Sequence, residues 1–324
     1  MPRAKRIPPI TPANKKPNIK DRPILKTKPI SIKKQIGSGG FGIVYQIEYN
    51  KKPAALKVVS KERMKGKLDI LKSEVQTIVR LQKKYPKCDK NLLCYQDIFE
   101  DREYVYFVSD LMKGDLIQLI TSKTFQNESI CKKINIYWNM FGQMIKGLDD
   151  LHKVGLLHRD IKPENILIGP SKSKSPYRKY VAKIADFGLG CMKNECSGVL
   201  GSVPYLQPRV LFQENFDDWR TGDDLYALGI TLFILLTGRH LIDKSIYEKL
   251  KEKGVSYKTA ALEYYKVYKS QIMLLEMVKI NSRKCPAATR KKLDILIKIT
   301  KFLTNPIPKQ NITVSSIKKI FKSK

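Results

Sequence analysis

Long apolar stretches are missing from this sequence of 324 residues. The longest apolar run, residues 225–236, can form a buried helix, whereas a helix that spans a bilayer needs about 20 apolar residues. The first residues also lack the apolar core of a secretory signal peptide. We therefore expect a protein without a membrane span that is intracellular, in the cytoplasm or the nucleus.

Histidines are rare, and the cysteines form no recognisable pattern. The chain has 3 histidines and 6 cysteines, without CxxC pairs or histidines beside the cysteines. This spacing excludes the common structural zinc sites and argues against a disulfide framework. We predict reduced thiols, as is usual inside cells, at Cys88, Cys94, Cys131, Cys191, Cys196 and Cys285.

Acidic residues are few. The chain has 30 Asp and Glu against 62 Lys and Arg, which gives a formal net charge of +32. Such a field attracts anions, and the partners that it favours are nucleic acid, acidic protein or an anionic surface. A second explanation stays open, because lysine is much commoner than arginine and isoleucine is abundant, as an AT-rich genome would encourage.

Residues 1–30 differ from the rest of the chain. They hold seven prolines, nine basic residues and one acid, and no apolar period runs through them. Such a segment cannot bury enough apolar surface to offset the entropy lost on ordering. We predict a disordered, basic, proline-rich tail over residues 1–30 and one folded unit over residues 31–324. The tail is a candidate contact for nucleic acid or another polyanion.

The folded unit begins with strands and continues with helices. Runs rich in β-branched and aromatic residues predict strands at 43–49, 54–59 and 104–109. Apolar residues at helical spacing predict helices at 68–79 and 134–151. The sequence therefore predicts an α+β fold, with a small β-rich part over about 31–110 and a larger helical part over about 111–324.

Two short runs in the helix-rich part carry groups that suit phosphoryl transfer. His158, Arg159 and Asp160 begin a run that ends with Asn165, and Asp186 begins an Asp-Phe-Gly run 26 positions after Asp160. The reaction needs one carboxylate that orients the attacking hydroxyl, and a second carboxylate plus an amide oxygen that hold magnesium against the phosphates. The two runs supply these groups in the order of the protein-kinase signature. At these residues the chain resembles the eukaryotic protein kinases.

The resemblance implies a two-lobed protein-kinase-like fold and a serine/threonine protein kinase that uses ATP and Mg²⁺ to phosphorylate protein substrates. Asp160 would be the catalytic base, and Lys162 would neutralise charge on the γ-phosphate. Asn165 and Asp186 would bind the metal. Arg159 could pair with a phosphorylated activation segment.

A glycine-rich run and a lysine extend the resemblance towards the N-terminus. Residues 37–44 are rich in glycine, which by itself is equally typical of a structural hairpin turn. Lys57 lies in an apolar strand, where a charge is costly unless it is paired, and Glu74 on the next helix is a suitable partner. In the resembled family this lysine binds the α- and β-phosphates and pairs with the helix glutamate. The nucleotide-binding residues that the resemblance implies are Ile36, Gly37, Ser38, Gly39, Gly40, Phe41, Gly42, Val44, Ala55, Lys57, Glu74, Asp110, Met112 and Leu167.

Other positions bear on specificity and on the stability of the fold. Lys162 and Ser202 match positions that are typical of serine/threonine kinases, and Asp224 matches an aspartate that supports the catalytic loop. Arg209 replaces the glutamate of the family's Ala-Pro-Glu motif, and Asn311 stands where the arginine partner of that glutamate is expected. Both charges of this pair are missing together, so neither is left buried without a partner.

Alternative functions follow from the same residues. An inactive scaffold would need a lost catalytic group, and none is lost. A kinase for lipids or small molecules disagrees with Lys162 and Ser202, and a nucleic-acid-binding protein on this fold would fit the charge. The substrate stays open, because Glu164 and Asp115 lie where related kinases recognise basic residues whereas the net charge favours acidic partners. The compact unit and the AT-biased composition would suit a large DNA virus, with the virion as a further location.

Overall fold

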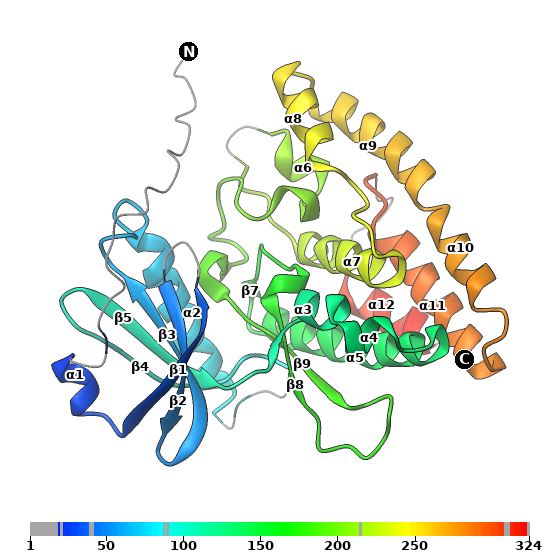
Figure 1. The fold of residues 1–324 in the computed structure, drawn as a ribbon. Helices are drawn as coiled ribbons and strands as arrows, with labels where there is room; N and C mark the ends of the chain where they lie inside the picture. Colours follow the sequence, from blue (N-terminus) through cyan, green and yellow to red (C-terminus); the bar gives the residue numbers. More distant parts are fainter. Residues whose placement is uncertain are drawn as a thin grey trace.

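The computed structural model describes Ile19 and residues 22–38, 42–86, 88, 91–213, 216–307 and 312–322. Figure 1 shows two lobes, a small one built around a β-sheet and a larger one built from helices. This arrangement confirms the predicted α+β architecture, with strands concentrated before residue 110 and helices after it. We call the two parts the N-lobe and the C-lobe.

The N-lobe is a five-stranded antiparallel sheet with one long helix. The strand order is β1-β2-β3-β5-β4, and the strands predicted at 43–49, 54–59 and 104–109 are β2, β3 and β5. The helix α2 is amphipathic and buries Leu71, Ile78 and Leu81, together with Glu74. These elements are β1 (Ile30–Ser38), β2 (Gly42–Tyr49), β3 (Lys52–Ser60), α2 (Leu68–Lys84), β4 (Tyr95–Glu100) and β5 (Tyr104–Asp110).

The opposite face of the sheet is covered by residues that precede it, which we call the strap (Ile19 and residues 22–29). The strap includes the short helix α1 (Pro23–Lys26), and its Ile19 and Leu25 are buried in a hydrophobic cluster with outward-facing residues of β2, β3 and β5. Because this burial offsets the entropy of ordering, the prediction of disorder over residues 1–30 is wrong for residues 22–30. Residues 1–18 of the predicted tail lie outside the described residues.

Three long helices form the centre of the C-lobe, α5 (Ile130–Lys153), α7 (Thr221–Thr237) and α11 (Ala287–Leu303). Every residue of α7 from Asp223 to Leu236 is buried, as expected for a helix that is apolar on all sides. No helix in the described ranges is long and apolar enough to cross a membrane. The other helices are α3 (Leu116–Thr121), α4 (Lys123–Gln126), α6 (Pro208–Leu211), α8 (Lys244–Glu252), α9 (Tyr257–Gln271), α10 (Leu274–Asn281) and α12 (Val314–Lys322).

Short strands carry the residues between the lobes. β8 (Ile166–Pro170) pairs with β6 (Gly114–Asp115) and with β9 (Tyr180–Ile184). β7 (Leu156–Leu157) pairs with β10 (Cys191–Met192). The segment 158–165 therefore lies between β7 and β8, and the Asp-Phe-Gly segment lies between β9 and β10.

All six cysteines are paired, so the prediction of reduced thiols without a disulfide framework is wrong. The Cα–Cα separations of the three pairs are 5.4, 5.4 and 5.5 Å, which suits disulfide bonds. Sequence spacing could not reveal the longest link, whose partners are 154 residues apart and meet only because α5 packs beside the start of α11. The disulfides are Cys88–Cys94, Cys131–Cys285 and Cys191–Cys196.

Candidate active site

The loop after β7 is held by a buried carboxylate at the start of α7. Asp224 accepts hydrogen bonds from the backbone N–H groups of His158 (2.9 Å) and Arg159 (2.8 Å). Arg159 has a left-handed backbone, with φ of +64°, a conformation that needs such support. The supporting role predicted for Asp224 therefore has a direct geometric basis.

His152 also belongs to this support, although its place at the end of α5 suggests only a packing residue. Its Nε2 lies 2.8 Å from Asp224 Oδ2, and both side chains are buried. Burial raises the pKa of Asp224, but the hydrogen bonds from His152 and from the backbone of His158 outweigh this effect and lower it. Asp224 is therefore held as an anion beneath the loop.

The three predicted catalytic residues meet at one carboxylate. Asp160 Oδ2 accepts hydrogen bonds from Lys162 Nζ at 2.7 Å and from Asn165 Nδ2 at 3.0 Å. Asp160 Oδ1 accepts from the backbone N–H of Ser202 at 3.0 Å. Lys162 Nζ also donates to Ser202 Oγ at 2.9 Å. The side chain of Ser202 thus lies beside the predicted base, next to the place where an attacking hydroxyl would have to bind.

A second charged cluster joins the N-lobe to the Asp-Phe-Gly segment. Lys57 Nζ lies 2.8 Å from Glu74 Oε1 and 3.5 Å from Asp186 Oδ1. Burial lowers the pKa of Lys57, but the two carboxylates outweigh this and raise it above its ordinary value. Lys57 in turn lowers the pKa of Asp186. The pairing predicted for Lys57 and Glu74 is therefore present, and it includes Asp186.

The predicted nucleotide-binding residues lie along the sheet and the segment that joins the lobes. Gly37 and Val44 face each other in the pairing of β1 with β2, and Ala55 pairs with Ser109 between β3 and β5. Gly42 has no room for a side chain, because a Cβ there would lie 2.4 Å from the backbone oxygen of Val58. The remaining members are distributed as follows: Ile36 and Ser38 in β1, Asp110 at the end of β5, Met112 just after it and Leu167 in β8, whereas Gly39, Gly40 and Phe41 lie outside the described residues.

The oxygen atoms near Asp160 fit a magnesium ion that is shared with phosphates. Both N–H groups of the Asn165 amide are directed at Asp160, so its Oδ1 is the atom left to bind a cation. The Asp186 side chain is 52% exposed and is therefore accessible to a ligand. Within the described ranges no group of three His, Cys, Asp or Glu residues could hold a metal alone. Magnesium commonly binds one or two protein oxygens plus substrate phosphates, which matches Asn165 and Asp186.

The segment after Asp186 is hydrogen-bonded to the predicted catalytic loop. Arg159 donates from Nε to the Leu189 oxygen at 2.6 Å and from Nη1 to the Ser197 oxygen at 3.0 Å. A cavity of about 270 Å³ lies between this segment and α2, with Arg80 and Arg159 among the residues that line it. Arg159 therefore faces the segment whose phosphorylated form it was predicted to bind.

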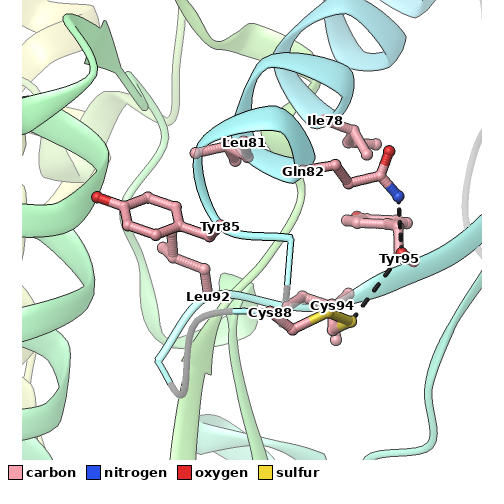
Figure 2. A pocket seen from close by; sticks show the side chains of 9 residues that line it. Ile78, Leu81, Gln82, Tyr85, Cys88, Leu92, Cys94 and Tyr95 are labelled. Atoms are coloured by element: carbon pink, nitrogen blue, oxygen red, sulfur yellow. Dashed lines mark hydrogen bonds between the residues drawn. A yellow bond between two sulfur atoms is a disulfide. The ribbon is translucent and has the colours of Figure 1, made fainter.

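Figure 2 shows a smaller cavity, of about 20 Å³, between the end of α2 and β4. The disulfide Cys88–Cys94 forms part of its wall, and Gln82 Nε2 donates to the Tyr95 oxygen at 2.8 Å across it. Room for about one water molecule is too little for a substrate or cofactor. We assign this cavity to the packing of α2.

Arg209 takes part in an ion pair that sequence comparison did not indicate. Its guanidinium contacts the buried carboxylate of Asp223 and lies 3.5 Å from Asp218 Oδ2. The position after the proline, which carries the glutamate of the family's ion pair, here carries a positive charge, and the negative partner is an aspartate. Asn311, the other position considered, lies outside the described residues. A local arginine–aspartate pair at the start of α7 thus supplies a charge contact between α6 and α7.

We expect Arg209→Ala to destabilise the protein by about 3–5 kcal/mol, because it leaves a buried carboxylate without its partner. Burial raises the pKa of Asp223 to about 6, and Arg209 opposes that rise, so the variant should raise it further. An aspartate whose folded pKa exceeds its unfolded pKa loses stability as the pH rises through that interval. Thermal unfolding should therefore show a larger loss of Tm at about pH 8 than at about pH 5.

Arg220→Gln is the matched control for this prediction. Arg220 bonds to Asp218 at the surface, with about half of each side chain exposed, so its loss should cost less than about 1 kcal/mol. Equal losses of Tm for Arg209→Ala at the two pH values would contradict the pairing with a buried Asp223.

Comparison with known proteins gives a consistent result. Residues 30–317 match the protein kinase domain. A calcium/calmodulin-dependent protein kinase type 1 from Macrobrachium nipponense is 32% identical over 232 residues, which is 69% of this chain and 59% of that protein. The serine/threonine-protein kinase unc-51 of Caenorhabditis elegans is 29% identical over 67% of this chain and 26% of its own length. CBL-interacting protein kinase 26 of Oryza sativa subsp. japonica is 29% identical over 67% of this chain and 42% of its own length. The chain thus spans between about a quarter and three fifths of these relatives.

Proposed function

This chain belongs to the protein kinase family, and on that premise we propose that it is an active serine/threonine protein kinase. It transfers the γ-phosphate of ATP to serine or threonine hydroxyls of protein substrates. The observation that carries this proposal is the bonded set of Asp160, Lys162 and Asn165, with the Lys57–Glu74 pair in place beside Asp186.

Each group has a part that follows from its position. Asp160 orients the substrate hydroxyl and accepts its proton, while Lys162, bonded to the same carboxylate, neutralises charge on the transferred phosphate. Lys57, held by Glu74, contacts the α- and β-phosphates of ATP. Bound Mg²⁺, held by Asp186 and Asn165, would supply further neutralisation of phosphate charge. Catalysis is then mainly positioning and electrostatic stabilisation.

The competing functions have weaker support. An inactive scaffold requires a missing catalytic group, yet each expected group is present at the site. Ser202 bonds to both Asp160 and Lys162, at the position typical of kinases that phosphorylate serine and threonine. That contact favours a protein hydroxyl over a lipid or a small alcohol as the acceptor.

Substrate sequence and regulation are finer proposals. Glu164 is exposed near the site and can attract basic residues of a substrate, whereas Asp115 caps α3 by accepting the N–H of Gln118 at 2.8 Å. Phosphorylation at Ser197 would place charge next to Arg159, whose guanidinium bonds to the Ser197 oxygen. The basic tail as a polyanion contact, the intracellular location and an origin in a large DNA virus stay predictions from composition.

The test is a phosphotransfer assay with ATP and Mg²⁺ on a mixed panel of proteins and small alcohols. We expect incorporation into proteins on serine and threonine and not on tyrosine, at roughly 1–100 turnovers per second on a good substrate. Binding of ATP without any transfer would support the scaffold instead. Transfer confined to small alcohols or lipids would contradict the assignment to protein substrates.

A further inference from the structure

Three segments at one end of the C-lobe carry charge that is almost entirely positive. They are the loop 171–179 between β8 and β9, residues 128–135 at the start of α5, and residues 283–292 leading into α11. These segments contain eleven basic side chains and one acidic side chain, Glu128, whereas the whole chain contains 62 basic and 30 acidic residues. We call the three segments the basic surface, and its cations are Lys132, Lys133, Lys172, Lys174, Arg178, Lys179, Arg283, Lys284, Arg290, Lys291 and Lys292.

Specific contacts hold the hairpin loop against α5. Lys179 of the loop and Lys132 of α5 both pair with Glu128, at 3.0 and 2.6 Å. Asn139 of α5 donates from Nδ2 to the Tyr177 oxygen at 3.1 Å. The loop projects beneath α5 in Figure 1, on the side away from α7. Its basic residues therefore lie next to those of α5.

The start of α11 is held against α5 just as closely. Cys131 of α5 is joined to Cys285 by a disulfide. Asn135 donates from Nδ2 to Thr289 Oγ1 at 2.9 Å and accepts from Lys292 Nζ at 2.5 Å. The three segments are thus parts of one surface, although they are distant in sequence.

Little on this surface neutralises the charge. Of the eleven cations, only Lys132 and Lys179 form ion pairs with described residues, and they share Glu128. Lys172, Lys174, Arg178, Arg290 and Lys291 are all exposed. Two long helices, of 24 and 17 residues, also begin here, so that their N-terminal dipoles add to the positive potential.

We propose that the basic surface binds the phosphate backbone of nucleic acid. A partner protein would be expected to meet an apolar centre, yet Tyr177 is the single large hydrophobic residue that is strongly exposed in these described segments, at 41%. Spaced cations without an apolar centre match repeated phosphates instead, and the exposed Tyr177 ring can stack on a base. Binding of this kind carries no sequence preference of its own, because phosphate contacts do not read base identity.

The loop 171–179 of the basic surface lies away from the predicted catalytic residues. β8 begins directly after Asn165, and β9 ends two residues before Asp186, so the loop 171–179 lies at the far ends of both strands. Strands of five residues place it roughly 15 Å from those site residues. A bound nucleic acid would therefore hold the enzyme near substrates on the same strand without blocking ATP.

The test measures binding of the full-length protein to a fluorescent DNA duplex of about 20 base pairs, by anisotropy at about 50 and about 200 mM salt. The variant replaces Lys172, Lys174 and Arg178 by glutamine, and these side chains make no ion pair with described residues. We expect affinity to fall at least about tenfold at the lower salt and the slope of log affinity against log salt to shrink by about 2 to 3. Peptide phosphorylation should stay at the level of the unchanged protein.

A matched variant replaces Lys249, Lys253 and Lys258 by glutamine, which removes the same charge from α8, α9 and the turn between them, at exposed positions. It should weaken DNA binding less than about twofold, since general field effects are screened over about 10 Å. Equal losses in the two variants would overturn the proposal in favour of a diffuse field. The basic tail can add phosphate contacts of its own, so a chain that lacks residues 1–18 should bind the duplex more weakly but should still lose affinity when Lys172, Lys174 and Arg178 are replaced. If the replacement has no effect in the shortened chain, the proposal is overturned in favour of the tail. If the replacement of Lys172, Lys174 and Arg178 lowered affinity for polyglutamate but not for the duplex, the basic surface would be a binding surface for acidic proteins instead.

Discussion

Asp160→Asn is expected to abolish phosphotransfer while the protein stays folded. The substitution keeps the shape of the side chain and one oxygen that can accept the N–H of Ser202, which now bonds at 3.0 Å. It removes the group that accepts the substrate proton. It also replaces the oxygen that accepts hydrogen bonds from Lys162 and Asn165 by an amide nitrogen, which can only donate. Loss of a positioned base costs roughly 10²–10⁴-fold in rate, and the lost orientation of Lys162 adds to this. The measurement is the rate of γ-phosphate transfer from ATP to a serine or threonine peptide.

Asp69→Asn on α2 provides the control, because that side chain is fully exposed and pairs only with the exposed Lys72 among the ion pairs of the described residues. Both variants should unfold within a few degrees of the unchanged protein. Activity of Asp160→Asn close to that of Asp69→Asn would show that another group serves as the base. Joint loss of activity and of Tm in Asp160→Asn would show a structural defect, and Asp160→Glu, which keeps the charge but moves it, would then distinguish the two roles.

The parts of the site that sequence could predict are those whose chemistry is local. Asp160, Lys162 and Asn165 lie within six positions of one another, so their order alone indicates a shared role, and they do meet at one carboxylate. A different argument predicts the Lys57–Glu74 pair. A lysine in an apolar strand requires a counter-charge, and a helix in the next segment carried one.

The parts that were missed depend on contacts between distant segments. His152 and Asp224 are 72 residues apart, and neither the buried bond between them nor the Cys131–Cys285 link has a signature in local spacing. The motif around Arg209 predicts only the loss of an ion pair, because it contains no information about Asp223, which lies 14 residues further on. The prediction of disorder from composition is also wrong for the strap, because it counts the many prolines and lysines and not the few apolar residues. Two apolar residues, Ile19 and Leu25, are buried against the sheet in that segment.

Removal of residues 1–29 should destabilise the N-lobe strongly, whereas removal of residues 1–18 should not. The longer deletion exposes apolar residues on the outer face of the sheet, among them Ile47, Leu56 and Val58, which are now buried with Ile19 and Leu25. Burial of one large apolar side chain contributes about 1.5–3 kcal/mol, so the two strap residues together contribute about 3–6 kcal/mol. The ion pairs of Arg22 with Glu103 and of Lys28 with Asp97 add less, because they are partly exposed.

The expected result is a fall in Tm of about 10 °C for the longer deletion, since 1 kcal/mol shifts the Tm of a domain of this size by about 2–4 °C. Peptide phosphorylation at physiological temperature should fall with it, because the N-lobe carries Lys57 and Glu74. The double substitution Ile19→Ser/Leu25→Ser in the full chain should reproduce most of the loss, because it removes apolar burial and keeps every charge. If the substituted chain and the longer deletion both unfold at the temperature of the full chain, the strap is not held by its two buried side chains. If only the deletion is unstable, the contacts of Arg22 and Lys28 hold the strap instead.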